Sequence, residues 1–447
     1  MKKFVSAFLV MVSLVLVISG CSSGEKSTKD EGEKSADQKE ELTFDSSLEG
    51  EITFWNFLPD IYDGVIEEFN KVYPNIKVKN VVLEFGELHD KLQTVTSAGS
   101  GAPDVALVEQ GSFPRYGNGV LENLLQEPYN AGRYQSDTSE YNWERWKSVD
   151  GTQLLGMPWD VTPGVFYYRE DLYEQHGLPS DPDELGEFLQ DPENVLTAAQ
   201  TFAANGIYMY EWRDSPAIQY GDAIGYYDSE YNWLRNDEKM ADLLDFVKRG
   251  VQIGWAPQVS ALFSDEGKQL VSQGKIASFP AGSQIARDLE TLFPDQAGKW
   301  RVTRMPLDLY VGLGGSAHVI PAQSQNKDAA WAFVEWMNRS EEAWKIFTDH
   351  SIQPGWTSIS TLPWYANHEN EYLGGQKDYA FYDTLDEHIP VRRLTPFDGQ
   401  AWEIYISHVA RAIDENIDSK TTLNQIEDQA EKQIRPEINK LLESESN

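Results

Sequence analysis

The 447-residue chain carries 72 acidic and 37 basic side chains, which gives a formal net charge of −35. So acidic a surface argues against nucleic acid and anionic lipid as partners. The single cysteine excludes disulfides within the chain and sites built from several thiols. The length and the 40% hydrophobic composition are sufficient for two domains of ordinary size.

The first 20 residues have the organisation of an export signal. Lys2 and Lys3 precede an apolar run over 4–18, and small residues lead up to Cys21. We interpret 1–20 as a lipoprotein signal peptide and Cys21 as the lipid-modified first residue of the mature protein, in preference to an ordinary signal peptide with a chance cysteine. The lipid anchor places the protein at the outer face of the cytoplasmic membrane, as in Gram-positive lipoproteins. The polar composition of residues 21–48 predicts a disordered tether.

Strand-like and amphipathic helical segments alternate after the tether, which predicts an α/β fold. Strands are expected at 51–57, 76–82 and 102–110, with helices over 61–69 and 88–98 between them. The third strand delivers Glu109 and Gln110 at its carboxyl end, where ligands bind in open α/β sheets. From residue 383 to the end, the chain is predicted to form covering helices.

The segment 151–173 is the centre of the predicted organisation. It reads as an apolar strand, a proline-bounded turn with Trp159 and Asp160, and a second strand at 165–168 that leads into a helix. The turn places a flat apolar ring beside a carboxylate, a pair that suits a ligand with an apolar face and many hydroxyls. A buried tryptophan that packs a strand end is the alternative interpretation.

Five segments together carry a resemblance to a known family. They are ITFWNF, GSGAPDVALVEQG, GMPWDVTPGVFYYREDLY, GKIASFPAGS and GLGGSAHVIPAQSQNKDAAWAFVEWM. In order and spacing they resemble the extracellular solute-binding proteins of carbohydrate ABC importers, the group that includes maltose-binding protein. Within that family, the stretch around residues 89–111 is most similar to proteins that carry arabinose-containing oligosaccharides or lactose.

The resemblance implies a two-lobe fold of the periplasmic-binding-protein type, with a hinge and a ligand cleft between the lobes. It places lobe one at 49–152 and 301–342, and lobe two at 153–300 and 343–447. It further implies a monomer that binds an oligosaccharide and presents it to the transmembrane subunits of an ABC permease. No catalytic activity and no cofactor are expected.

Sugar rings are held by aromatic platforms and by planar side chains that make two hydrogen bonds. The predicted ligand contacts are at strand ends and turns of both lobes, partly on the strength of the resemblance: Trp55, Asn56, Glu109, Gln110, Trp159, Asp160, Glu211, Trp212, Ser283, Gln284, Gly315, Ser316 and Trp356. Trp55 and Trp356 have packing inside a lobe as an equal alternative. Many relatives have a tryptophan where Gln284 stands, so an amide replaces one stacking platform.

Two other classes of function stay open. A surface hydrolase would use Glu109, Asp160 and Glu211 as acid and nucleophile or base, but the spacing does not require such a pair. An adhesion or scaffold lipoprotein would need no hinge. The histidines show no metal-ligand spacing, and no nucleotide-binding or nucleophile-elbow motif is present in the sequence.

Overall fold

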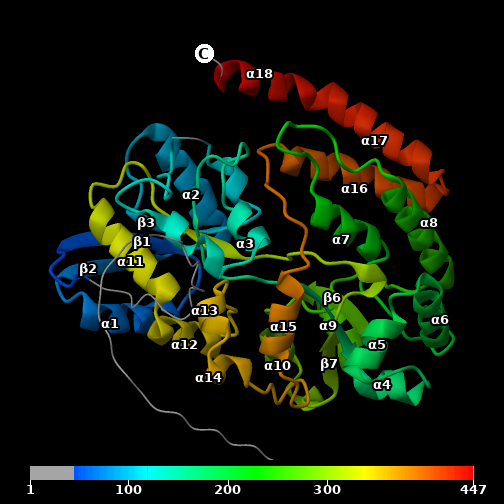
Figure 1. Cartoon of the computed structure of the whole chain (residues 1–447). Helices are drawn as coiled ribbons and strands as arrows, with labels where there is room; N and C mark the ends of the chain where they lie inside the picture. The colour runs from blue at the N-terminus through cyan, green and yellow to red at the C-terminus, as the bar shows by residue number, and fades with distance from the viewer. Residues whose placement is uncertain (1–44, 118, 446–447) are drawn as a thin grey trace, which may run out of the picture. The chain divides into compact units, whose positions relative to one another are not determined.

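A computed structural model describes residues 45–117 and 119–445 (Figure 1). The predicted signal peptide, Cys21 and the predicted tether up to residue 44 lie outside the described residues. The strands of this structure are β1 (Gly50–Asn56), β2 (Ile76–Val82), β3 (Val105–Glu109), β4 (Met157–Pro158), β5 (Gly164–Arg169), β6 (Ser278–Gly282), β7 (Trp300–Thr303) and β8 (Ser316–Val319).

Helices make up most of the remaining secondary structure. The α-helices are α1 (Tyr62–Val72), α2 (Phe85–Ala98), α3 (Glu140–Glu144), α4 (Glu170–Gln175), α5 (Pro182–Phe188), α6 (Pro192–Ala203), α7 (Ser215–Ile224), α8 (Glu238–Ile253), α9 (Asp265–Ser272), α10 (Ile285–Leu292), α11 (Lys327–Arg339), α12 (Glu341–Asp349), α13 (Thr357–Ser360), α14 (Pro363–Ala366), α15 (Asp378–Asp386), α16 (Asp398–Glu415), α17 (Ser419–Gln433) and α18 (Arg435–Glu445). Short 3-10 turns are η1 (Phe113–Arg115), η2 (Ala131–Asp137), η3 (Pro294–Gln296) and η4 (Pro306–Asp308).

The first sheet has the strand order β2-β1-β3-β8-β4. β1 pairs in parallel with β2 and β3, whereas β8 pairs antiparallel with β3 and β4. The predicted strand at 76–82 is confirmed, and the other two predicted strands are confirmed with slightly different ends. Parallel pairing brings the carboxyl ends of β1, β2 and β3 to one edge of the sheet, which is where Glu109 lies.

The second sheet has the order β6-β5-β7, with antiparallel pairing on both sides of β5. All residues of β5 are buried, and they alternate between two hydrophobic clusters. Phe166 and Tyr168 belong to the cluster formed with α8, α16 and α17, whereas Val165 and Tyr167 belong to the cluster formed with α10 and α15. The two-residue period of a strand thus supplies both cores from one segment.

Three elements lie a few residues across the predicted lobe boundaries. β4 pairs in the first sheet although the second lobe was expected from residue 153, and β7 begins at residue 300 in the second sheet although 301 was assigned to lobe one. α12 packs against α1 and α11 beside the first sheet, beyond the expected boundary at 342. Contacts between residues far apart in the sequence determine where β4, β7 and α12 pack, and no local sequence pattern marks these boundaries.

The predicted C-terminal helices are interrupted by an extended segment. The chain leaves helical geometry after α15 and re-enters it at α16, and Pro390 and Pro396 stand in the intervening stretch 387–397. Proline removes a backbone donor and disfavours helix in the residue before it, which explains the break. In Figure 1 this orange segment rises from α15 past α3 towards α16.

Candidate functional site

Three backbone segments run side by side where the chain passes between the two sheets. Residues 159–163 connect β4 to β5, residues 304–315 connect β7 to β8, and residues 350–356 follow α12. The first segment is bonded to both of the others: Leu313 N donates to Thr162 O at 2.9 Å, Gly164 N to Val311 O at 2.7 Å, Val161 N to Gln353 O at 3.2 Å, and Gly355 N to Trp159 O at 3.0 Å. This three-segment hinge is the structural base of the site.

Arg145, at the C-terminus of α3, organises the polar groups above the hinge. Its side chain is almost fully buried. The guanidinium donates to Gln110 Oε1 at 3.2 Å, to Gly314 O at 2.8 Å and to Asp160 O at 2.7 Å. One buried cation therefore ties the end of β3 to two of the hinge segments, with fixed planar geometry.

Two acidic side chains lie beside this guanidinium. Asp160 Oδ1 accepts a hydrogen bond from Ser316 N at 2.6 Å, and Glu109 Oε2 accepts one from Gly111 N at 2.8 Å. Burial raises the pKa of Asp160 to about 6 and that of Glu109 to about 6, although the charge of Arg145 lowers both. Each carboxyl group therefore takes up protons close to neutral pH.

The second sheet contributes Gln284, which follows β6. A side chain at Gly314 would approach Thr162 Oγ1 to 2.9 Å and Gln284 Nε2 to 3.8 Å, so both side chains face this glycine. Within the described part of the chain, Thr162 Oγ1 and Gln284 Oε1 are buried without a hydrogen-bond partner. Buried polar atoms normally have partners, so Thr162 Oγ1 and Gln284 Oε1 have unused hydrogen-bonding capacity beside the hinge.

A cavity of about 180 Å³ is lined by residues from both halves of the fold. Residues after β3 and before β4 face residues that precede α8, precede α16 or belong to α18. The lining consists of Phe113, Pro114, Tyr116, Gly117, Lys147, Ser148, Val149, Asp150, Leu155, Ser229, Tyr231, Leu394, Pro396, Leu441 and Leu442.

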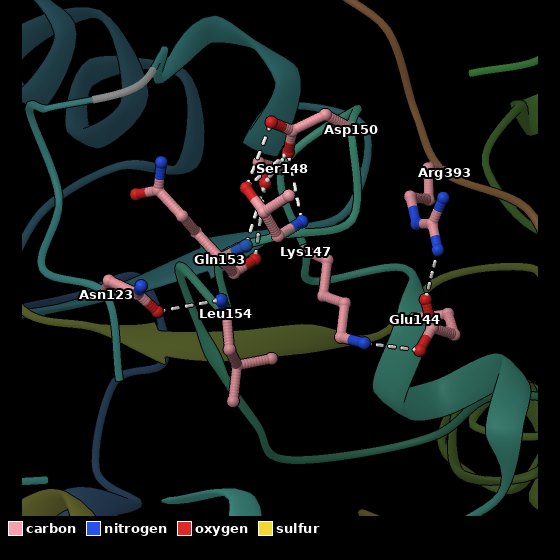
Figure 2. Close-up of polar contacts among 9 residues, drawn as sticks. Asn123, Glu144, Lys147, Ser148, Asp150, Gln153, Leu154 and Arg393 are labelled. Atoms are coloured by element: carbon pink, nitrogen blue, oxygen red, sulfur yellow. Dashed lines mark hydrogen bonds and ion pairs between the residues drawn. The ribbon is translucent and has the colours of Figure 1, made fainter. Parts of the chain in front are cut away.

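A polar turn forms the first-sheet wall of this cavity (Figure 2). Ser148 Oγ donates to Asp150 Oδ1 at 2.6 Å, and Gln153 N donates to Ser148 Oγ at 3.1 Å. Asn123 Oδ1 accepts a hydrogen bond from Leu154 N at 3.2 Å and fixes the end of the turn. This turn therefore gives the cavity wall a carboxylate and a hydroxyl, each held by hydrogen bonds within the turn.

The family model of bacterial extracellular solute-binding proteins matches residues 58–344, which is more than half of the chain. The chain belongs to this family. The arabinooligosaccharide-binding protein of Bacillus subtilis (strain 168) is 28% identical to this solute-binding protein over 365 residues, 76% of this chain and 78% of that protein.

Two solved structures have the same fold. The sugar-binding protein MalE of Xanthomonas citri matches with a TM-score of 0.72 at 21% identity, over 88% of this chain and 99% of that chain. The galacto-N-biose-/lacto-N-biose I-binding protein of an ABC transporter of Bifidobacterium longum, solved with lacto-N-biose, matches with a TM-score of 0.70 at 19% identity, over 87% and 98%. They confirm the predicted two-lobe α/β fold of the periplasmic-binding-protein type.

Of the predicted ligand contacts in this solute-binding protein, one group is gathered at the hinge. They are Glu109, Gln110, Asp160, Gln284, Gly315 and Ser316, and together with Thr162 they are called the hinge group. Gln110 N donates to Gly315 O at 3.0 Å, and Glu109 pairs with Ser316 in the β3–β8 ladder. Their direct contact with a sugar stays a prediction, because only their mutual placement is observed.

Trp159, which was predicted to form a stacking platform, lies in the protein core in this structure. The ring is 1% exposed. It packs against Phe347 at 5.0 Å, His318 at 5.4 Å and Tyr62 at 5.8 Å between ring centroids. The ring of Trp159 thus packs in the core at the end of a strand, as in the alternative interpretation. The carboxylate of the next residue, Asp160, faces the hinge.

Four other predicted contacts are also buried and engaged within the protein. Asn56 donates to Asn80 Oδ1 at 2.7 Å, and Ser283 Oγ donates to Gln353 Oε1. The Trp55 ring lies under Lys91 Nζ at 4.6 Å, and the Trp356 ring lies under the Arg339 guanidinium at 4.5 Å. These side chains stabilise their own lobes and present no free face in this structure.

Glu211 and Trp212 lie apart from the hinge group, at the start of the turn into α7. Trp212 is 38% exposed, so its ring remains available as a platform. Glu211 Oε2 accepts a hydrogen bond from Ala261 N at 2.7 Å, and burial raises the pKa of its carboxyl to about 7.

Sequence reasoning missed Arg145, Thr162 and the aromatic cavity residues Phe113 and Tyr116. No motif marks Arg145, whereas the proximity of Phe113 to Glu109 and Gln110 in the chain was a usable signal. Within residues 45–117 and 119–445, no group of three or more acidic, histidine or cysteine side chains is placed to hold a metal ion. The same ranges contain no helix with both the length and the apolar character of a membrane span.

Proposed function

We propose that this solute-binding protein captures an oligosaccharide between its two lobes and delivers it, chemically unaltered, to the permease of an ABC importer. The observation that carries this proposal is the hinge group, where Gln110, Thr162 and Gln284 bring polar side chains from both sheets to one place. Planar amides and hydroxyls beside a rigid hinge suit a ligand rich in hydroxyl groups, and binding at a domain interface favours closure.

The names of the compared proteins favour a sugar as the ligand. The B. subtilis relative is an arabinooligosaccharide-binding protein, and the B. longum structure contains lacto-N-biose. An arabinose-containing oligosaccharide is therefore our first choice of ligand. Contacts with Glu109, Asp160, Glu211, Trp212, Gly315 and Ser316 belong to the same proposal.

We further propose a monomer, anchored at the outer membrane face through lipid on Cys21 and working with the transmembrane subunits of the permease. The lipobox-like sequence before Cys21 supports the anchor. We expect neither a nucleic acid nor a cofactor to take part in this function. The two lobes are centred on the first and the second sheet.

A thermal-shift screen of residues 22–447 against arabino-, galacto-, malto- and xylo-oligosaccharides tests the proposal. A bound sugar at a hundredfold excess over its Kd stabilises the fold by about 2.7 kcal/mol. A selective shift with intact recovered sugar supports capture, whereas release of reducing ends supports the hydrolase alternative. No shift with any sugar contradicts the proposal and favours peptides or other small polar solutes as ligands, or an adhesion or scaffold role.

A further inference from the structure

Arg393 connects parts of the protein that belong to different sheets. It lies between α15 and α16, whose buried residues pack in the two clusters around β5. Its side chain, however, reaches Glu144 in α3 (Figure 2). The turn that leads into α3 is fixed to the other lobe, because Tyr134 donates to Glu335 of α11 at 2.7 Å. The contact therefore crosses from one lobe to the other.

Glu144 receives this cation with both carboxylate oxygens occupied. Arg393 Nη2 lies 2.5 Å from Oε2, and Lys147 Nζ lies 2.6 Å from Oε1. Glu144 is 8% exposed. Burial acts to raise the pKa of this carboxyl, but the hydrogen bonds from Lys147 and Arg393 prevail and lower it. Glu144 is therefore an anion held by one cation of its own lobe and one of the other lobe.

The backbone of the first lobe is shaped to accept the Arg393 guanidinium. Gly151 has a φ of +74°, and a β-carbon at this position would lie 2.7 Å from Arg393 Cζ. Only glycine combines this backbone conformation with room for the planar group. Leu394, which follows Arg393 in the chain, lines the cavity together with Lys147 and Asp150. The contact thus stands at the edge of the space between the lobes.

We propose that Arg393 is an interlobe latch, a positioning residue that acts through Glu144 to hold the lobes closed over the cavity. For its effect on affinity, this inference rests on the proposed function. Loss of Arg393 leaves Glu144 paired with Lys147 of its own lobe, so the charged contact between the lobes is lost. Loss of the latch lowers the closed fraction of the unliganded protein, and the apparent Kd rises in proportion.

The test measures the distance between the lobes by pulsed electron paramagnetic resonance. Spin labels are attached in the full chain with Cys21→Ser, Glu87→Cys and Glu238→Cys, since the latter two are exposed helical positions on different lobes. Arg393→Gln is expected to shift the unliganded distance distribution to longer values and to weaken binding of arabinotriose about fivefold or more. Arg393→Lys keeps the charge and is expected to restore part of both.

Two matched controls separate the latch from a general loss of charge. Arg392→Gln removes the neighbouring cation, whose side chain lies near Gly225 of the second lobe, and Lys147→Gln removes the partner of Glu144 within the first lobe. Both are expected to keep the distance distribution of the parent protein. An unchanged distribution in Arg393→Gln would overturn the latch. Since this readout needs no sugar, failure of arabinotriose to bind would contradict the ligand choice alone.

Discussion

Thr162 allows the proposed site to be tested at a single side-chain atom. Its side chain is buried in the first hinge segment, and Oγ1 has no partner among the described residues. A buried hydroxyl without a hydrogen bond destabilises a fold, whereas the same hydroxyl aids a ligand that supplies the partner.

Thr162→Val is therefore expected to raise the free energy of unfolding of the unliganded protein by about 1 kcal/mol and to weaken sugar binding. Thr96→Val is the control, because Thr96 Oγ1 donates to Leu92 O at 2.7 Å and its loss is expected to destabilise the fold. Urea denaturation and calorimetric titration measure the two effects. Equal destabilisation by both substitutions would remove Thr162 from the site.

Glu211 makes a testable contribution to the pH dependence of stability. Burial raises the pKa of its carboxyl to about 7, above the value of about 4.3 expected in the unfolded chain. The folded state therefore binds more protons between these values, so this group makes the free energy of unfolding fall as pH rises through that window.

Glu211→Gln is expected to raise the free energy of unfolding at pH 8 by roughly 1–3 kcal/mol and to change it little at pH 4. Glu193→Gln is the matched control, because the hydrogen bond from Arg249 lowers the pKa of Glu193 and its removal gives no gain at pH 8. Denaturant unfolding at pH 4 and pH 8 measures the free energy of unfolding of both variants and of the parent protein. A parallel pH profile for Glu211→Gln and the parent protein would contradict the assigned shift.

At the scale of elements, the sequence predicted the strands well because their patterns are local. The alternating pattern at 76–82 and the apolar run at 165–168 are recognisable without knowledge of their neighbours. The direction of a side chain at the hinge is not local. Trp159 and Asp160 are adjacent, yet the ring lies in the core and the carboxylate faces Ser316. Likewise, only tertiary structure brings Arg145 to Gln110 and Gly314.

The glycine turn before β8 is the element most closely fitted to the site. Gly315 has a φ of +110°, and a β-carbon there would lie 2.5 Å from an Arg145 nitrogen. Gly315→Ala is expected to lower the free energy of unfolding by about 1–3 kcal/mol and to weaken sugar binding as Arg145 is displaced. Gly399→Ala, in α16 with open space around it, is expected to be neutral or slightly stabilising. Similar denaturation midpoints for the two variants would contradict this role.

For the whole molecule, the family and the two-lobe fold could be predicted from the sequence, because segments spread over most of the chain resemble the family in order and spacing. The identity of the residues that line the space between the lobes could not. The cavity draws on residues 113–117, 147–155, 229–231, 394–396 and 441–442, and no local pattern connects them. The extended segment 387–397, predicted as helix, provides both cavity lining and the Arg393 contact.

We propose above that the hinge group binds an oligosaccharide without cleaving it. The most direct measurement is calorimetric titration of the protein and of its Gln110→Ala, Gln284→Ala double variant with the oligosaccharide selected by the thermal screen, followed by mass spectrometry of the recovered sugar. We expect binding of one intact sugar per chain and at least about tenfold weaker binding by the variant, since each lost hydrogen bond contributes about 1 kcal/mol. Unaltered affinity in the variant, or cleaved sugar, would contradict it.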